Sequence, residues 1–394
     1  MKKKVWIICA VALFLQLFQV TCLAETTSGG VADQLRGVAD QLRQVQQYNF
    51  SIGILAMLLV GFGFLMVFVK KYGFSATTGT YIVVATALPF YLFLRSTGIL
   101  SSEAIPSDSI RSLLFAEFAA AAALIAMGAV LGRLKIYQYA LLGILIVPAY
   151  MLNEWLVLDG GLGFTKGFVD AAGSIVIHSF GAYFGLGLAV ALTAMKFRNV
   201  TITSDAVSDR FSMLGSMVLW VFWPSFCSAV VEPGQVQVTV INTILALCGA
   251  TLSTYVMSLL LRKGKVVIAD IANASLAGGV AIGATCNIVS QPMAFGIGIA
   301  AGALCVIGYA VIQARLESKM KIVDTCGVHN LHGMPGLLGG LVAIIVVPGA
   351  AVAQLSGILF TIVLAFSAGV VGGYIIKLTG NKAVAYEDAE EFAE

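Results

Sequence analysis

The sequence predicts an all-α membrane protein with eleven transmembrane helices, built as an inverted repeat of five plus five helices followed by one C-terminal helix. Three observations support this fold class. Of the 394 residues, 59% are hydrophobic and only 11% are charged, a composition that excludes a water-soluble globular domain. Eleven apolar runs are long enough to cross a bilayer. A pattern of aspartate, glycine and histidine occurs once in each half of the chain.

The first element is a targeting segment. A run of three lysines precedes the apolar stretch VWIICAVALFLQLFQV, which ends near the small-x-small pattern Cys22-Leu23-Ala24. This order is typical of a secretory signal peptide, so we expect residues 1–24 to be removed on maturation. The alternative is a retained twelfth helix, because the two kinds of segment are similar in sequence.

Residues 25–48 follow as an outer N-terminal segment with a tandem heptad, VADQLRG-VADQLRQ. At helical spacing its large apolar residues share one stripe. These residues are Val31, Leu35, Val38, Leu42 and Val45. The simpler interpretation is a short helix on the outer surface, and the alternative is a contact between subunits.

The membrane domain is predicted at residues 49–378. Its apolar runs have charges between them rather than within them, and each is roughly 17 to 26 residues long, the length that a bilayer requires. The runs lie near residues 50–69, 76–94, 112–132, 136–152, 171–195, 211–231, 236–261, 266–288, 293–314, 325–347 and 353–376.

Basic residues predict the orientation of these spans. If the signal peptide is removed, the N-terminus is outside and eleven spans place the C-terminus in the cytoplasm. The cytoplasmic connections then hold Lys70, Lys71, Arg133, Lys135, Lys196, Arg198, Arg210, Arg262, Lys263, Lys265, Arg315, Lys319, Lys321, Lys377 and Lys382. The outer side holds only Arg36, Arg43, Arg95, Arg111 and Lys166. This asymmetry supports an integral protein of a bacterial inner membrane with its N-terminus outside.

The net charge of +3 therefore reflects membrane orientation. The sequence has no basic patch with interleaved aromatic residues, so it does not indicate a nucleic-acid partner. The last residues, 379–394, form a short acidic cytoplasmic tail that we expect to be disordered.

The repeated pattern is the strongest functional signal. In DAAGSIVIH the three residues are Asp170, Gly173 and His178, and in DTCGVHNLH the residues Asp324, Gly327 and His332 have identical offsets. Each copy begins the fifth helix of its half, and five spans per half is an odd number, so the halves are inverted across the bilayer. Both aspartates are placed to cap helix starts.

The two repeated histidines lie two turns further on, near the middle of the membrane. An ionisable residue at that depth is costly and indicates function, whereas the alternative is a neutral core histidine satisfied by a carbonyl. A third histidine, His329, lies one turn nearer the helix start, and we expect it on the same pore-facing side. The repeat register favours His332 rather than His329 as the partner of His178.

At these residues the sequence resembles the Rhesus (Rh) glycoprotein branch of the ammonium transporter superfamily, over essentially the whole membrane domain. The specific stretches are DTCGVHNLHGMPG, DAAGSIVIHSFGAYFGLG, WVFWPSFCSA and DIANASLAGGVA. The resemblance implies a homotrimer in which each subunit has its own hydrophobic pore, lined at mid-depth by hydrogen-bonded His178 and His332. It also implies a gate of two stacked phenylalanines, which by position are Phe118 and Phe226.

The sequence departs from the Amt branch at the outer mouth. Amt relatives carry a tryptophan and a serine that form a cation-recruitment site, and here those positions are Leu158 and Val230. A cation–π cage for ammonium is therefore missing, which favours the Rh branch. Cys227 stands where an asparagine is expected after the gate phenylalanine. We expect Glu117, beside the gate, to be protonated or hydrogen-bonded between helices.

Residue chemistry favours ammonia over ammonium as the conducted species. A bare ion in an apolar pore faces a penalty of tens of kcal/mol, whereas neutral ammonia loses only hydrogen bonds. Paired neutral imidazoles replace those bonds, and Asp170 is placed to bias their proton positions. We expect no enzymatic activity and no cofactor.

Three alternatives stay open at this stage. One is a proton-coupled or electrogenic ammonium transporter. Another is a metal-binding membrane protein that uses Cys326, His329 and His332, with His178 as a fourth ligand. A third is a sensor of ammonium, which would normally carry an appended signalling domain.

Overall fold

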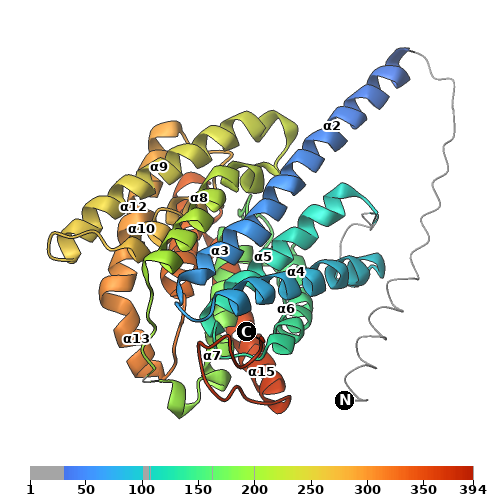
Figure 1. Ribbon diagram of the computed structural model, residues 1–394. Helices are drawn as coiled ribbons and strands as arrows, with labels where there is room; N and C mark the ends of the chain where they lie inside the picture. Colours follow the sequence, from blue (N-terminus) through green and yellow to red (C-terminus); the bar gives the residue numbers. More distant parts are fainter. Residues whose placement is uncertain (1–30, 101–105, 107, 162, 199, 394) are drawn as a thin grey trace. The chain divides into compact units, whose positions relative to one another are not determined.

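A computed structural model describes residues 31–100, 106, 108–161, 163–198 and 200–393, and every regular element in these ranges is a helix (Figure 1). The predicted signal peptide, residues 1–24, lies outside the described residues. The chain divides into two units, residues 1–44 and 45–394. The described part of the first is helical from residue 31, and the second contains the membrane domain. The predicted all-α class is confirmed.

The first half of the membrane domain contains five spans. Their elements are α2 (Val31–Ala56), η1 (Met57–Phe62), α3 (Gly63–Leu65), η2 (Met66–Phe68), α4 (Gly73–Ser96), α5 (Ile110–Val130), α6 (Ile136–Val157), η3 (Ser174–Ser179), α7 (Phe180–Leu192) and η4 (Met195–Phe197). Here η1 and η3 are π-helical turns, a form that occurs frequently at functional sites.

The second half repeats this organisation and adds the C-terminal helix. Its elements are α8 (Ala206–Ser228), η5 (Pro233–Gln235), α9 (Val236–Leu261), α10 (Ile268–Ala274), α11 (Ala277–Ile282), α12 (Gln291–Ile307), η6 (Gly308–Ile312), α13 (Gln313–Met320), η7 (His329–Gly333), α14 (Met334–Val346) and α15 (Ala351–Leu378). The turn η7, like η3, is π-helical.

Ten of the predicted spans are continuous apolar helices within the described residues. The eleventh, predicted at 266–288, is broken into α10 and α11, which together cover Ile268–Ile282. The break falls at Ser275 and Leu276. The segment DIANASLAGG combines polar and glycine residues, which stabilise a helix poorly. A broken helix at membrane depth is tolerated where it is buried in protein.

The two halves interlock through the loops that precede η3 and η7. The amide N–H groups of Ala171 and Ala172 donate to carbonyls of residues 284 and 283, which follow α11. In the same way the N–H groups of Thr325 and Cys326 donate to carbonyls of residues 129 and 128, at the end of α5. Each half therefore holds the fifth span of the other through its own third span, as an inverted repeat requires.

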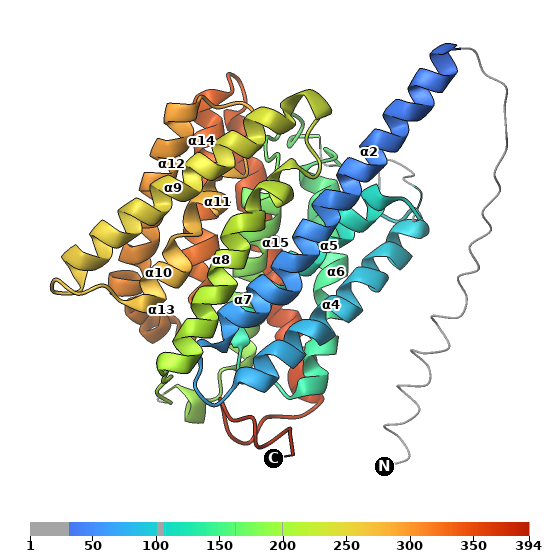
Figure 2. The ribbon, with the colours of Figure 1, turned by 45° about the horizontal axis from the view of Figure 1, so that its top comes forward.

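The centre of the bundle is α5. Ser109 caps it by accepting a hydrogen bond from the N–H of Ser112, which satisfies one of the free donors at a helix start. Almost every side chain from Leu114 to Val130 is buried, and the run of five alanines from Ala119 lets neighbouring helices approach closely. Around this core α9 packs against α12 and α7 packs against α15, and Figure 2 shows α9 beside α12.

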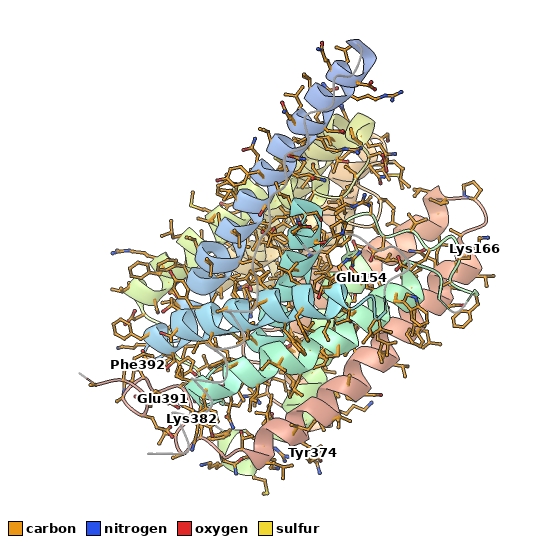
Figure 3. The ribbon with its side chains drawn as sticks, turned by 90° about the vertical axis from the view of Figure 1, so that its right-hand side faces the viewer. Glu154, Lys166, Tyr374, Lys382, Glu391 and Phe392 are labelled. Atoms are coloured by element: carbon orange, nitrogen blue, oxygen red, sulfur yellow. The ribbon has the colours of Figure 1, made fainter. Side chains whose placement is uncertain are left out.

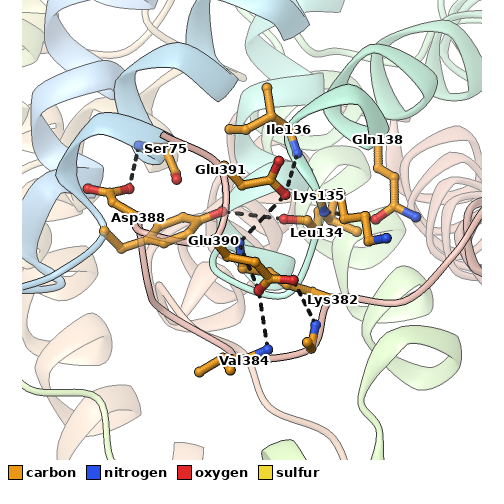
Figure 4. A network of polar contacts seen from close by, with 12 residues as sticks. Ser75, Leu134, Lys135, Ile136, Gln138, Lys382, Val384, Asp388, Glu390 and Glu391 are labelled. Carbon is orange, nitrogen blue, oxygen red and sulfur yellow. Dashed lines mark hydrogen bonds and ion pairs between the residues drawn. The ribbon is translucent and has the colours of Figure 1, made fainter. Parts of the chain in front are cut away.

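The acidic tail is ordered, contrary to the prediction of disorder. Carboxylate oxygens of Asp388 accept hydrogen bonds from the N–H groups of Phe74 and Ser75 at 3.0 and 2.8 Å. Glu391 accepts one from Ile136 N–H at 3.3 Å (Figure 4). The tail acids thus bind the N-terminal ends of α4 and α6, where free donors and the helix dipole favour anions. Hydropathy alone does not reveal these partners.

A buried lysine of the tail, Lys382, forms ion pairs with two tail glutamates. The Lys382 ammonium has no exposed side-chain surface and lies 3.7 Å from Glu390 and 3.8 Å from Glu391. Burial raises the pKa of Glu390, but hydrogen bonds from the N–H groups of residues 383 and 384 and the Lys382 charge outweigh it, so the pKa is lowered. Lys382 and Glu391 lie at one end of the bundle, and Lys166 lies at the other (Figure 3).

Candidate functional site

Two buried histidines meet at the centre of the membrane domain. The Nδ1 atoms of His178 and His332 are 3.3 Å apart, and their rings are nearly parallel, with centroids 5.4 Å apart and an interplanar angle of 11°. The residues are 3% and 4% exposed. The structure therefore brings together the pair that the repeat register predicted.

This geometry constrains the protons on the two rings. One Nδ1 must donate to the other, so in a neutral pair one ring carries its proton on Nδ1 and the other on Nε2. The Nε2 atom of His178 is buried and has no hydrogen-bond partner among the described residues. The pair therefore offers a small polar molecule both a donor and an acceptor while staying uncharged.

The aspartates of the repeat position the histidine helices. Asp170 Oδ2 accepts hydrogen bonds from Ile175 N–H at 3.0 Å and Val176 N–H at 2.8 Å. Asp324 accepts from Val328 N–H through Oδ1 at 3.0 Å and from His329 N–H through Oδ2 at 3.1 Å. Both carboxylates are buried and bind the free donors at a helix start. Neither touches a histidine ring.

The glycine of each copy adopts a conformation that other residues avoid. Gly173 has φ +76° and Gly327 has φ +66°, in the left-handed region that glycine enters without steric cost. These turns reverse the chain between the capping aspartate and the π-helical turn that carries the histidine. The Asp-x2-Gly-x4-His spacing thus has a local structural cause in both copies.

The third histidine is not part of the hydrogen-bonded pair, and its place on the pore-facing side stays a prediction. His329 packs against the Tyr183 ring, with centroids 5.9 Å apart at 67°, and its Nδ1 has no hydrogen-bond partner among the described residues. In a π-helical turn a step of three residues covers only about two-thirds of a turn. His329 and His332 therefore have different contacts, Tyr183 for the first and His178 for the second.

Aromatic rings lie against both histidines, and more of them lie against His178. The rings of Phe118 and Phe226 are 4.8 Å apart, and Phe226 lies 5.8 Å from His178. Two further rings were not identified from the sequence. Trp223 stacks on His178 at 5.7 Å with an interplanar angle of 21°, and Phe62 stacks on His332 at 6.2 Å. Trp223 lies in the quoted motif WVFWPSFCSA, but among many apolar aromatics nothing singled it out.

A narrow, mostly apolar cavity begins at His332. Its volume is about 20 Å³, which is room for roughly one water-sized molecule, since such a molecule needs about 10–15 Å³. Phe68, Asn273 and Cys326 line both this cavity and a wider one of about 200 Å³. The polar side chains of the wider cavity come from Ser204, Asp209, Ser212, Asn273, Gln313 and Thr325. The small cavity at His332 thus shares lining residues with a wider cavity that has more polar side chains around it.

The remaining sequence candidates, Glu117, Leu158, Val230 and Cys227, do not line either of these cavities. Ser51 Oγ donates a 2.6 Å hydrogen bond to Glu117, which is fully buried, so the expected bond between helices is confirmed. Leu158 is exposed at the end of α6, and Val230 is half-buried after α8. Neither is aromatic or hydroxylated, so these two positions supply no cation cage. Cys227 is buried.

The proposed metal ligands do not cluster. Among the described residues, no group of three or more histidine, cysteine, aspartate or glutamate side chains is arranged to hold a metal ion. The alternative that uses Cys326, His329 and His332 therefore loses its geometric basis.

Comparison with known proteins places this arrangement in a family. Residues 6–392 match the Ammonium Transporter Family. The chain belongs to this family. It is 38% identical to the ammonium transporter Rh type B of Oryctolagus cuniculus over 82% of this chain and 76% of the relative. The match to the human Rh type B protein is 37% identical with the same coverage.

A solved structure of the family has nearly the same fold. It is described as Nitrosomonas europaea Rh50 and mechanism of conduction by the Rhesus protein family of channels. It shares 63% sequence identity with this chain at a TM-score of 0.89, covering 90% of this chain and 93% of the other. The chain is thus a member of the Rh branch, and the resemblance inferred from the sequence is confirmed.

Proposed function

We propose that this chain forms an Rh-type channel that conducts ammonia, NH3 taken from ammonium, across the membrane. The observation that carries the proposal is the buried His178–His332 pair, placed between an aromatic stack and a cavity of about 20 Å³. The family relatives, named as ammonium transporters and Rhesus channels, support it.

The species conducted is the neutral molecule. Ammonium in an apolar pore pays a desolvation cost of tens of kcal/mol, and an uncharged imidazole pair cannot offset it. Ammonia gives up only hydrogen bonds with water, and the pair replaces them with one donor and one acceptor. Ammonium therefore leaves its proton at the outer mouth, and ammonia takes one up again on the other side.

Each site residue has a role in this path. Phe118 and Phe226 close the outer mouth to hydrated ions, and His178 and His332 form the polar centre. Asp170 and Asp324 position the histidines through the backbone of η3 and η7. His329, which packs against Tyr183, stays in the proposal as a pore-facing residue outside the hydrogen-bonded pair. The path needs no cofactor and makes or breaks no covalent bond in the protein, and the chain is not an enzyme.

The surroundings of the channel complete the proposal. We infer a homotrimer in a bacterial inner membrane, with residues 1–24 removed as a signal peptide, residues 25–48 outside and residues 379–394 in the cytoplasm. The excess of basic residues on the side of Lys382 supports this orientation. The membrane domain, residues 49–378, contains one conduction path in each subunit.

Stopped-flow measurement on proteoliposomes tests the function. An inward ammonia gradient alkalinises the vesicle interior, and a pH-sensitive dye reports the rate. We expect faster alkalinisation than in protein-free vesicles of the same lipid and size. A rate equal to that of the protein-free vesicles would refute conduction of ammonia, provided that reconstituted protein is present in the vesicles in its folded state.

A further inference from the structure

One face of α2 is apolar and uncovered. In residues 45–56 the membrane domain buries the opposite face, where Ser51 is 2% and Ile54 is 0% exposed. Val45, Tyr48 and Ile52 remain 58%, 56% and 48% exposed. The fold thus fixes which side of this helix points away from the protomer.

In the sequence, a heptad repeat that begins in residues 31–44 continues in the same phase through these three residues. Numbered so that leucines fall at position a, Leu35 and Leu42 are a residues, and the d residues are Val38, Val45 and Ile52. Leu35, Val38 and Leu42 are 64%, 53% and 66% exposed, and α2 is helical throughout Val31–Ala56. The next a position is Asn49, which is also exposed. A single asparagine at a specifies register and strand number in coiled coils.

The seam of this repeat, formed by its a and d positions, and the positions beside it carry no charged residue in residues 34–52. The positions that flank a seam, e and g, are Gln34, Ala39, Gln41, Gln46 and Tyr48, and all are neutral. The charged residues Asp33, Arg36, Asp40 and Arg43 fall at b and f, away from the seam. Asp33 and Arg36 pair within the helix at 3.7 Å. Identical helices therefore meet without like-charge repulsion, and nothing on the seam matches a charged partner.

We propose that α2 forms a parallel, in-register coiled coil with α2 of other copies of this chain, on the outer side of the membrane. Leucine at a with β-branched residues at d favours three or four strands over two. The seam from Leu35 to Asn49 is only about 22 Å long at 1.5 Å per residue, too short to be stable alone. Anchoring the helices in one membrane assembly supplies the effective concentration that they need.

Cysteine cross-linking of the full chain in its membrane tests the seam. In a parallel coil, equal a positions of two chains face each other, so Leu42→Cys should form covalent dimers with a short bismaleimide. Asp40→Cys, at the f position, is the matched control and points away from the seam. We expect at least about fivefold more dimer from Leu42→Cys, after subtraction of the unsubstituted chain. Equal yields, or no dimer from Leu42→Cys, would overturn the proposal.

A second measurement does not depend on cysteine reactivity. The temperature at which the purified oligomer dissociates in mild detergent should fall in Leu42→Asp and rise in Asn49→Leu, because the first places charge in the seam and the second removes its polar residue. Asp40→Ala should leave it unchanged. Dissociation temperatures that do not differ among the four proteins would also overturn the proposal. Ammonia flux is measured separately, and its presence or absence has no bearing on either outcome.

Discussion

The two copies of the Asp-x2-Gly-x4-His pattern share a backbone but differ in their surroundings. Both have a buried aspartate, a left-handed glycine and a π-helical turn that contains the histidine of the pair. His178 lies against Trp223 and Phe226. His332 lines the small cavity that shares residues with the wider cavity. The difference teaches that the repeat sets where two imidazoles meet. The neighbouring spans, which the repeat does not constrain, give the path its two unlike ends.

The copies also differ in how they are held. Asp170 accepts the N–H groups of Ile175 and Val176 through one oxygen, Oδ2, and its Oδ1 has no partner among the described residues. Asp324 uses both oxygens. In the second copy the Tyr386 hydroxyl of the tail hydrogen-bonds Thr325 Oγ1 at 3.1 Å, and among the described residues no hydrogen bond joins the tail to the first copy. These asymmetries lead to predictions that compare matched positions.

The largest effect is expected from a substitution that breaks the His178–His332 pair, compared with one at the neighbouring His329. His332→Ala removes one partner of a buried hydrogen bond, which costs about 1–3 kcal/mol, and should lower ammonia flux about tenfold or more. His329→Ala removes only a contact with Tyr183 and should lower it less than about twofold, since no path hydrogen bond is lost. Stopped-flow rates per reconstituted protein compare the two. The reverse ranking would show that the histidines are assigned the wrong way round.

The capping aspartates should respond differently to loss of one oxygen. Asp324→Asn leaves a single acceptor for two separate N–H donors and turns an amide N–H toward one of them, so we expect about 1.5–3 kcal/mol of destabilisation. Asp170→Asn keeps the one oxygen that both N–H groups use and should cost less, about 1 kcal/mol. Thermal unfolding in detergent at matched lipid content measures the difference. Equal losses would indicate that the caps act through charge alone.

The smallest effects concern the tail, which binds the N-terminal ends of α4 and α6 and contacts the second copy at Thr325. Glu390 has a lowered pKa in the folded chain, below its ordinary value of about 4.3. Its stabilising contribution is therefore present above the ordinary pKa and is lost as the pH falls through the folded pKa. Protease protection of the tail should decline in that acidic window. Glu390→Gln should show weaker protection at neutral pH and less dependence on pH, and an unchanged profile would rule out this role.

Much of this fold follows from the sequence because membrane spans and their orientation depend on composition. The repeat placed His178 opposite His332 correctly, since equal offsets from a capped helix start give equal depth. The π-helical turn that begins at His329 and the contact of His329 with Tyr183 could not be predicted, because no residue pattern in the sequence indicates them. Stacking of Phe62 and Trp223 on the histidines depends on how distant spans pack, and single-sequence hydropathy carries no information on that packing.

The tail and the broken span show the same limit. An acidic segment of low hydropathy suggests disorder, yet Asp388 and Glu391 accept hydrogen bonds from the N-terminal ends of α4 and α6, which are distant in the sequence. The break between α10 and α11 was hidden in an apolar run because hydropathy measures transfer into lipid and not helix continuity. Each of these features is determined by partners in three dimensions.

The most direct test of the account is ammonia flux recorded together with membrane current on the same proteoliposomes. A channel for the neutral molecule predicts alkalinisation that accelerates as the pH rises and the free-ammonia fraction grows, with little or no steady current under an ammonium gradient. His178→Asp should introduce current, because a carboxylate at mid-depth offsets part of the desolvation cost of the ion. A large ammonium-dependent current in the unsubstituted protein would contradict the account and establish electrogenic ammonium transport in its place.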